Sequence, residues 1–193
     1  EADTFYSSEL EPWSRFLTGE QGKKPEPEWD PMRFMIEECH RRAMEFHAWI
    51  NPYRVKTSLK NKLAPEHIYH QHPEWFVTYG DQLYFDPALP ESREYICKIV
   101  TDIVSRYDVD AIHMDDYFYP SLEASETMND GAEFQKYGKD KFKNVEDFRR
   151  NNVNTVVRNI QKTIIETRPE VIFSISPAAD MERNYNTLFA DVN

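Results

Sequence analysis

The chain has 193 residues, of which 34 are acidic and 23 are basic, giving a formal net charge of −11 at pH 7. So acidic a chain repels nucleic acid and anionic membranes, and we expect neither as a partner. The length suits one ordinary domain, but it is short of the roughly 250 residues of a complete eight-stranded α/β barrel. The sequence contains no apolar run long enough for a transmembrane segment.

Three helices are predicted in chain order. The first begins at Asp30-Pro31, a preferred N-cap followed by a preferred first-turn proline, and its apolar spacing ends near Met44 or Glu45. The second covers about 91–107, and the third begins at Asn144 and ends before Pro169. The two cysteines fall within the first two helical patterns, which predicts buried free thiols rather than a disulfide.

Three strands alternate with these helices, at 45–54, 110–120 and 171–176. Each alternates large apolar residues with small or polar ones, which is the period of a strand. Polar residues follow at each strand end, namely Asn51 and Arg54, Asp115 and Asp116, and Ser176 with Asp180 further on. These residues predict a ligand site, although Arg54 fits a structural ion pair equally well.

The connection 55–90 carries two further patterns. Gly80-Asp81 is a hairpin turn signal between two short apolar runs. His67, His70 and His72 have spacing that resembles metal ligands, but no second ligand group lies close by in the sequence. We therefore predict no metal and no cofactor.

The stretch Asp110 to Pro120 reads as a buried strand with a polar, aromatic end. Its alternation points Asp115 toward the axis of an α/β barrel, at the carboxyl end of the strand, where barrel enzymes keep their chemistry. Tyr117, Phe118 and Tyr119 then form an aromatic rim. The alternative is that Asp115 and Asp116 cap the next helix or bind backbone amides.

The order of helix and strand predicts parallel strands with right-handed crossovers, whose carboxyl ends share one face. A doubly wound sheet would give the same edge, but no glycine-rich phosphate loop is present. We therefore expect an α/β fold, a (β/α)8 TIM barrel of which 1–193 forms one partial domain. Because open sheet edges favour association, the isolated chain is expected to self-assemble or to be poorly soluble, unless it is a smaller complete fold.

Several motifs carry a family resemblance: Glu11-Pro-Trp-Ser14, His47-Ala-Trp-Ile-Asn-Pro-Tyr-Arg54, Tyr84-Phe-Asp-Pro87, Tyr107 to Pro120 and Ile175-Ser-Pro177. With them the chain resembles the glycosyl-hydrolase-like family 10 domain of bacterial cell-envelope proteins. The resemblance implies a TIM-barrel glycoside hydrolase, and it implies that this chain begins after the second barrel strand and stops after the fifth. Many members are secreted or lipid-anchored lipoproteins, which implies a cell-envelope or extracellular location.

We therefore expect a glycoside hydrolase that cleaves a bacterial glycan, with peptidoglycan glycan strands as one candidate. Such enzymes need two carboxyl groups around the glycosidic bond. Asp115 is the first choice for one of them, and Asp116 is the other catalytic candidate, although neighbouring strand residues point to opposite faces, so it is not expected to oppose Asp115. Asp180 and Glu182 are candidates for the opposing carboxyl group, and a barrel strand outside 1–193 is an equally good source of it. The candidate substrate-binding residues are His47, Trp49, Asn51, Tyr53, Arg54, His113, Tyr117, Tyr119, Ser176 and Asp180.

Two other functions remain open at this point. A carbohydrate-binding barrel without catalysis would keep the aromatic residues and lack the second carboxylate. A metal-dependent hydrolase or deacetylase would use His47, His113 and Asp115 as ligands. A carbohydrate-binding barrel would bind glycan without cleaving it, so an assay of glycan cleavage distinguishes it from a glycoside hydrolase. A metal-dependent hydrolase would hold stoichiometric metal, so metal analysis of the purified protein distinguishes it.

Overall fold

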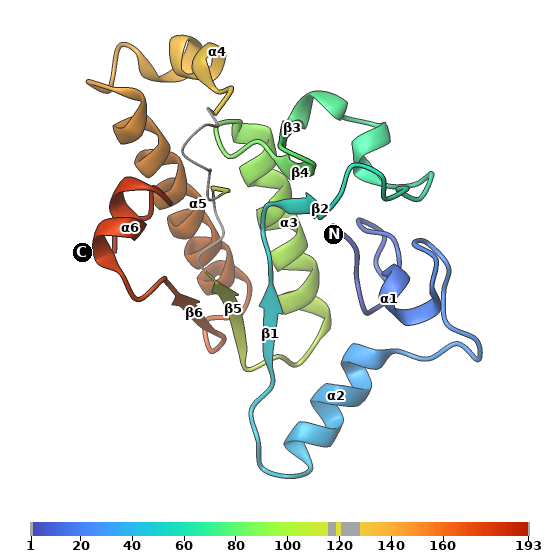
Figure 1. Cartoon of the computed structure of the whole chain (residues 1–193). Helices are drawn as coiled ribbons and strands as arrows, with labels where there is room; N and C mark the ends of the chain where they lie inside the picture. The colour runs from blue at the N-terminus through green and yellow to red at the C-terminus, as the bar shows by residue number, and fades with distance from the viewer. Residues whose placement is uncertain (1, 116–118, 121–127, 193) are drawn as a thin grey trace.

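A parallel sheet organises the computed structural model, which describes residues 2–115, 119–120 and 128–192. Its strands are β1 (His47–Ile50), β5 (Ala111–Asp115) and β6 (Ile172–Ser176), in the order β1-β5-β6. The three arrows lie side by side and point the same way in Figure 1. The register places His47 opposite Ala111 and Asp115 opposite Ser176, so the carboxyl ends of β5 and β6 are level.

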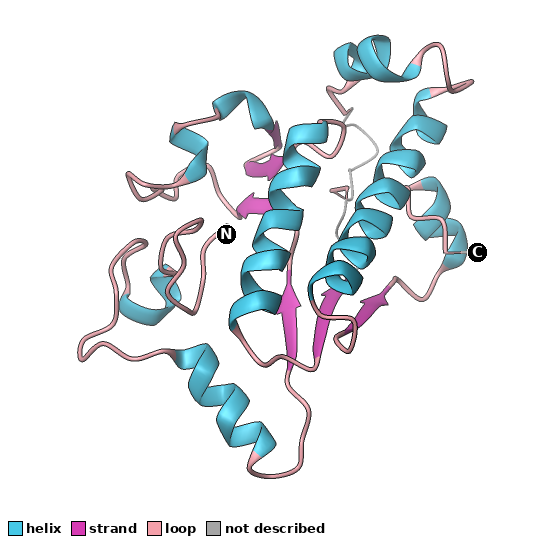
Figure 2. Cartoon of the chain, turned by 180° about the vertical axis from the view of Figure 1, so that it is seen from behind, coloured by secondary structure: helices cyan, strands magenta, loops and turns pink. Residues whose placement is uncertain are grey.

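Two long helices connect these strands. The α3 helix (Pro90–Arg106) precedes β5, and α5 (Val145–Thr167) joins β5 to β6. Both helices cover the same face of the sheet (Figure 2). Right-handed crossovers that advance steadily in one direction keep their helices on one side, as in a barrel, whereas a doubly wound sheet has helices on both sides. The fold is therefore part of a (β/α) barrel, as predicted.

The core lies between the sheet and these helices, and the strand alternation decides which side chains enter it. Ile112 and Met114 are fully buried there, while His113 and Asp115 alternate to the other face and are partly exposed. The buried helix residues lie at helical spacing: Ile96, Val100, Ile103 and Val104 from α3, with Val153, Val156, Ile160 and Ile164 from α5.

A small antiparallel sheet is inserted between β1 and α3. Its strands are β2 (Arg54–Lys56), β3 (Phe76–Tyr79) and β4 (Gln82–Phe85), in the order β2-β4-β3, with the short 3-10 helices η1 (Ile68–His70) and η2 (Pro73–Trp75) before β3. The predicted hairpin at residues 80–81 is confirmed. The predicted strand within 45–54 is confirmed as β1 and ends before Pro52, as expected. The Asn51 side chain then accepts the Arg54 amide proton at 3.0 Å, and Arg54 begins the separate strand β2, which the sequence does not predict.

The helix α2 (Pro31–His40) begins at its predicted cap, since the Asp30 carboxylate accepts the Arg33 amide proton at 3.0 Å. Its predicted end near Met44 is wrong. Ala43 adopts a left-handed conformation with φ 57°. The Ala43 amide then bonds to His40 O and the Met44 amide to Cys39 O, both at 3.0 Å, which is a Schellman termination. The sequence hides this stop because glycine usually marks it.

The remaining elements are short: α1 (Arg15–Thr18), α4 (Gly131–Glu133), the π-helical turn η3 (Phe134–Gly138) and α6 (Met181–Asn186). Cys39 and Cys97 are free thiols, both partly buried. Within residues 2–115, 119–120 and 128–192, no helix is both long and apolar enough to span a bilayer.

Candidate functional site

The candidate site lies on the sheet face opposite the helices, at the carboxyl ends of β5 and β6. Asp115, the last residue of β5, pairs in register with Ser176, the last residue of β6. One level below, His113 lies between Trp49 of β1 and Ser174 of β6. The His113 Nδ1 and the Ser174 Oγ are 2.8 Å apart, which is a hydrogen bond. These levels bring together a carboxylate, an imidazole, hydroxyls and an indole.

The exposure of these side chains suits ligand contact. Trp49 is 67% exposed on this face, Ser176 is exposed, and Asp115 and His113 are partly buried. An exposed indole offers an apolar plane to a sugar ring, while the polar groups beside it can bond sugar hydroxyls. The arrangement can therefore bind a carbohydrate and present a carboxylate to it.

Asn51 and Arg54 lie just beyond β1. The Asn51 Oδ1 is occupied by the Arg54 amide at 3.0 Å, and the Asn51 and Arg54 side chains are partly exposed. Tyr53 between them is 0% exposed, so its assignment to substrate binding is corrected. Its ring packs in the hydrophobic core, and burial raises the pKa of its hydroxyl.

Two other predicted substrate contacts are corrected by their positions. Tyr119 is 1% exposed, with its hydroxyl accepting a bond from Asn152 Nδ2 at 3.2 Å and its ring meeting the edge of Phe189. His47 stands at the amino end of β1, opposite the end that carries the site, and its Nε2 pairs with Glu45 at 2.8 Å. Both therefore contribute to structure rather than to the strand-end face.

Asp180 follows β6 as the exposed N-cap of α6, where its Oδ1 accepts the Arg183 amide proton at 3.0 Å. Its other oxygen leaves it able to meet a ligand. Asp116 and Tyr117 lie outside the described residues, as does Phe118 of the predicted aromatic rim.

The metal alternative does not match the geometry. In the part of the chain that the structure describes, no three His, Cys, Asp or Glu side chains are grouped so that they could hold a metal ion. His47 pairs in register with Ala111, two residues below His113. In the loop, His67 is buried and its Nδ1 accepts the Tyr69 amide proton, while His72 stacks on Trp75 with ring centroids 3.9 Å apart.

A buried ion pair on the helix side of the sheet is not predicted from the sequence. Arg149 of α5 bonds both oxygens of Asp130, at 2.7 and 2.6 Å, and its guanidinium lies over the Phe189 ring. Asp130 is 2% exposed and directly precedes α4. The pair ties the start of α4 to α5, and no local sequence signal marks it because the two residues are distant in sequence.

Another buried carboxyl, Asp86, lies at the start of α3. Burial, together with the nearby acids Glu133 and Asp130, raises the pKa of Asp86 to about 6, while the amide bond from Ala88 at 2.8 Å acts in the opposite direction. Asp86 is 7% exposed, and its side chain and carbonyl accept the Ala88 and Leu89 amide protons, so it holds the turn that precedes α3.

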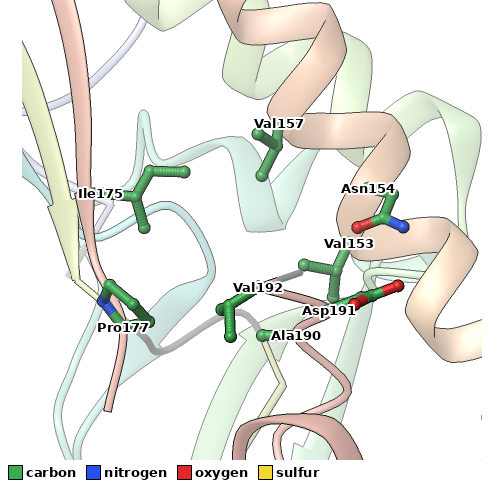
Figure 3. A pocket seen from close by; sticks show the side chains of 8 residues that line it. All are labelled: Val153, Asn154, Val157, Ile175, Pro177, Ala190, Asp191 and Val192. Carbon is green, nitrogen blue, oxygen red and sulfur yellow. The ribbon is translucent and has the colours of Figure 1, made fainter. Parts of the chain in front are cut away.

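The pocket in Figure 3 lies on the other face of β6, among residues of α5 and the C-terminal segment. Val153 and Val157 of α5 face Ile175 of β6, and Pro177 and Val192 close the pocket. Its lining is mostly apolar, and Ile175 alternates away from Ser174 and Ser176. This pocket is therefore separate from the candidate site.

Parallel strands with one-sided crossover helices and polar strand ends define a protein built on part of a TIM barrel. Solved structures agree: the α-L-fucosidase isoenzyme 2 of Paenibacillus thiaminolyticus aligns with a TM-score of 0.56 and 15% identity, over 89% of this chain and 25% of that one. The α-galactosidase of Lactobacillus brevis aligns with a TM-score of 0.50 and 18% identity, over 85% of this chain and 22% of that one. At these identities the likeness establishes the fold alone.

The chain belongs to the glycosyl hydrolase-like 10 family, whose model matches residues 1–193. It is 48% identical to the glycosyl hydrolase YngK of Bacillus subtilis, over 98% of this chain and 40% of that protein. It is 39% identical to the glycosyl hydrolase DigH of Escherichia coli K12, over 90% of this chain and 41% of that protein. The chain thus spans about two fifths of the length of these relatives. The family supports a glycoside hydrolase type of function.

Proposed function

We propose that the protein containing this chain hydrolyses a bacterial glycan at the carboxyl ends of its barrel strands, with Asp115 as a catalytic carboxylate. One observation carries the proposal. Asp115 and Ser176 are register partners at the strand ends, next to the register row of Trp49, His113 and Ser174, and both rows lie on the sheet face opposite α3 and α5. A glycosidase needs a carboxylate that faces the sugar from a rigid element, and the end of a paired strand provides that rigidity.

Binding would be shared among the residues around this carboxylate. The exposed Trp49 indole supports stacking on a sugar ring, and His113, Ser176, Asn51, Arg54 and Asp180 offer hydrogen bonds or charge. Asp116 and Tyr117 stay proposals from the sequence. Asp180 and Glu182 are candidates within this chain for the opposing carboxyl group, which acts as acid, base or nucleophile, and a barrel strand outside 1–193 is the other source of it.

The family supports a proposal for the substrate class. The relatives named glycosyl hydrolases come from bacteria, and the resemblance to cell-envelope proteins favours envelope glycan. We propose peptidoglycan glycan strands as the first substrate to test, with the protein acting in the envelope or outside the cell. Fractionation of the source cells tests the location, and recovery in the cytosol alone would contradict it.

The decisive variant is Asp115→Asn in the full-length protein. The change keeps the size of the side chain but removes its charge, so we expect kcat to fall by several orders of magnitude while glycan affinity changes little. Reducing ends released from peptide-free glycan strands report the rate, and a melting temperature checks the fold. Ser105→Ala, an exposed hydroxyl on α3, is the matched control.

Normal turnover by Asp115→Asn would remove this carboxylate from the mechanism. Binding without cleavage by the wild-type protein would instead favour a carbohydrate-binding barrel, which the exposed Trp49 also suits.

A further inference from the structure

The side-chain level below Asp115 contains one direct bond between strands. His113 of β5 and Ser174 of β6 are register partners, and the His113 Nδ1 lies 2.8 Å from the Ser174 Oγ. Both side chains are partly buried, so water competes only weakly with this bond. The bond joins two strands that are 61 residues apart in sequence.

When one ring nitrogen of a histidine is held by a hydrogen bond, the other nitrogen has a fixed role as donor or acceptor. Which ring nitrogen carries the proton is set by the bond that the other one makes. If the serine hydroxyl donates to Nδ1, then Nε2 carries the proton and donates; if Nδ1 donates, then Nε2 accepts. Among the described residues no group bonds the His113 Nε2, so this nitrogen is available to a ligand.

The position of the His113 imidazole relative to Asp115 indicates where a bound glycan would lie. His113 stands two residues before Asp115 on the same strand face, and Trp49 flanks it on β1. A glycan held against Asp115 would therefore pass over the imidazole.

We propose that Ser174 is a positioning residue, which holds the His113 imidazole in one orientation and one tautomer so that Nε2 meets the glycan beside Asp115. The inference rests on the proposed function, and it adds to the site a residue that makes no contact with the glycan. Ser174 acts through His113, whereas Ser176, at the strand end, is positioned to contact the ligand directly.

The first test reads the imidazole itself. The full-length protein, labelled with 15N-histidine, gives Nδ1 and Nε2 shifts that report the tautomer, and the His113 signal is assigned by its loss in His113→Gln. We expect one tautomer in the wild type, a mixture in Ser174→Ala, and recovery in Ser174→Thr. An unchanged His113 spectrum in Ser174→Ala would overturn the inference, whether or not any glycan is cleaved.

The second test is a double-mutant cycle on cleavage of peptide-free glycan strands. Losing one neutral hydrogen bond predicts a fall of about threefold to tenfold in kcat/KM for Ser174→Ala. Because Ser174 acts through the ring, the same change should have no further effect in a His113→Gln background. Equal losses in both backgrounds would refute positioning. A wild-type protein that cleaves no strands would refute the proposed function instead, and the two failures stay distinct.

Discussion

The buried carboxyl group of Glu11 should make the stability of the fold depend on pH. Glu11 belongs to the N-terminal segment and is 5% exposed, and neither of its oxygens has a hydrogen-bond partner at normal distance among the described residues. Burial raises its pKa to about 8, although the Tyr95 hydroxyl partly favours the charged form. That hydroxyl donates its own proton to the Leu10 carbonyl at 2.8 Å, so it has an oxygen left to accept a bond from neutral Glu11.

The sign follows from the protons that each state binds. The ordinary pKa of a glutamate is 4.5, and the pKa of Glu11 in the folded state is about 8. Between these two pH values the folded state holds a proton on Glu11 that the unfolded state has lost. The contribution to stability is therefore complete below pH 4.5 and is lost as pH rises through 8. At about 1.4 kcal/mol for each pKa unit, a full loss amounts to about 5 kcal/mol. Detachment of the N-terminal segment alone would limit the loss to the stability of that segment.

Amide hydrogen exchange of the full-length protein tests this directly. The Thr4 amide bonds to Pro12 O at 2.9 Å and the Ser14 amide to Thr4 O at 2.8 Å, so both report opening of the segment. We expect their opening free energies to fall between pH 5 and pH 9 by about 3–5 kcal/mol in the wild type, and far less in Glu11→Gln. Glu9→Gln, at an exposed position, is the control. An equal pH dependence in the wild type and Glu11→Gln would refute the reasoning.

Three further predictions concern stability and assembly. Ala43→Gly should raise the free energy of unfolding by about 0.5–1 kcal/mol in urea denaturation, because Ala43 has a positive φ of 57° that glycine adopts freely; a loss of stability would contradict this. Arg149→Met should lower the free energy of unfolding by about 3–5 kcal/mol, because it leaves the Asp130 carboxylate buried without its cation. Adding Asp130→Asn should restore part of that loss, and no recovery would argue against a charge effect. The 193-residue chain made alone should self-associate, since β1 and β6 have unpaired outer edges among the described residues; a monodisperse monomer in sedimentation velocity would count against this.

The strand faces could be predicted from sequence because they depend only on local alternation. Ile112 and Met114 pack on the helices while His113 and Asp115 face away, as the period of two requires. The long helices were equally readable, since their apolar residues recur at helical spacing. The class of fold then followed from the order of the elements.

Other features depend on partners that are distant in sequence. Tyr53 and Tyr119 were assigned to the site because they follow strands, yet tertiary packing buries both. The three-residue strand β2 has no pattern of its own and exists because it pairs with β4. The bond between His113 and Ser174 needed the register of β5 and β6, which alternation alone does not specify.

The register of the parallel sheet also constrains how the chain can fold. His47 and Ala111 are 64 positions apart, as 111 − 47 = 64, and Ala111 and Ile172 are 61 apart, as 172 − 111 = 61. Pairing strands across such spans costs loop-closure entropy, so we expect α3 and α5 to dock before the strands align. During synthesis β6 emerges after β1 and β5, and Asp115 and Ser176 would become neighbours only then. Pulse-labelled hydrogen exchange should accordingly protect β1 and β5 before β6, which makes the candidate site a late product of folding.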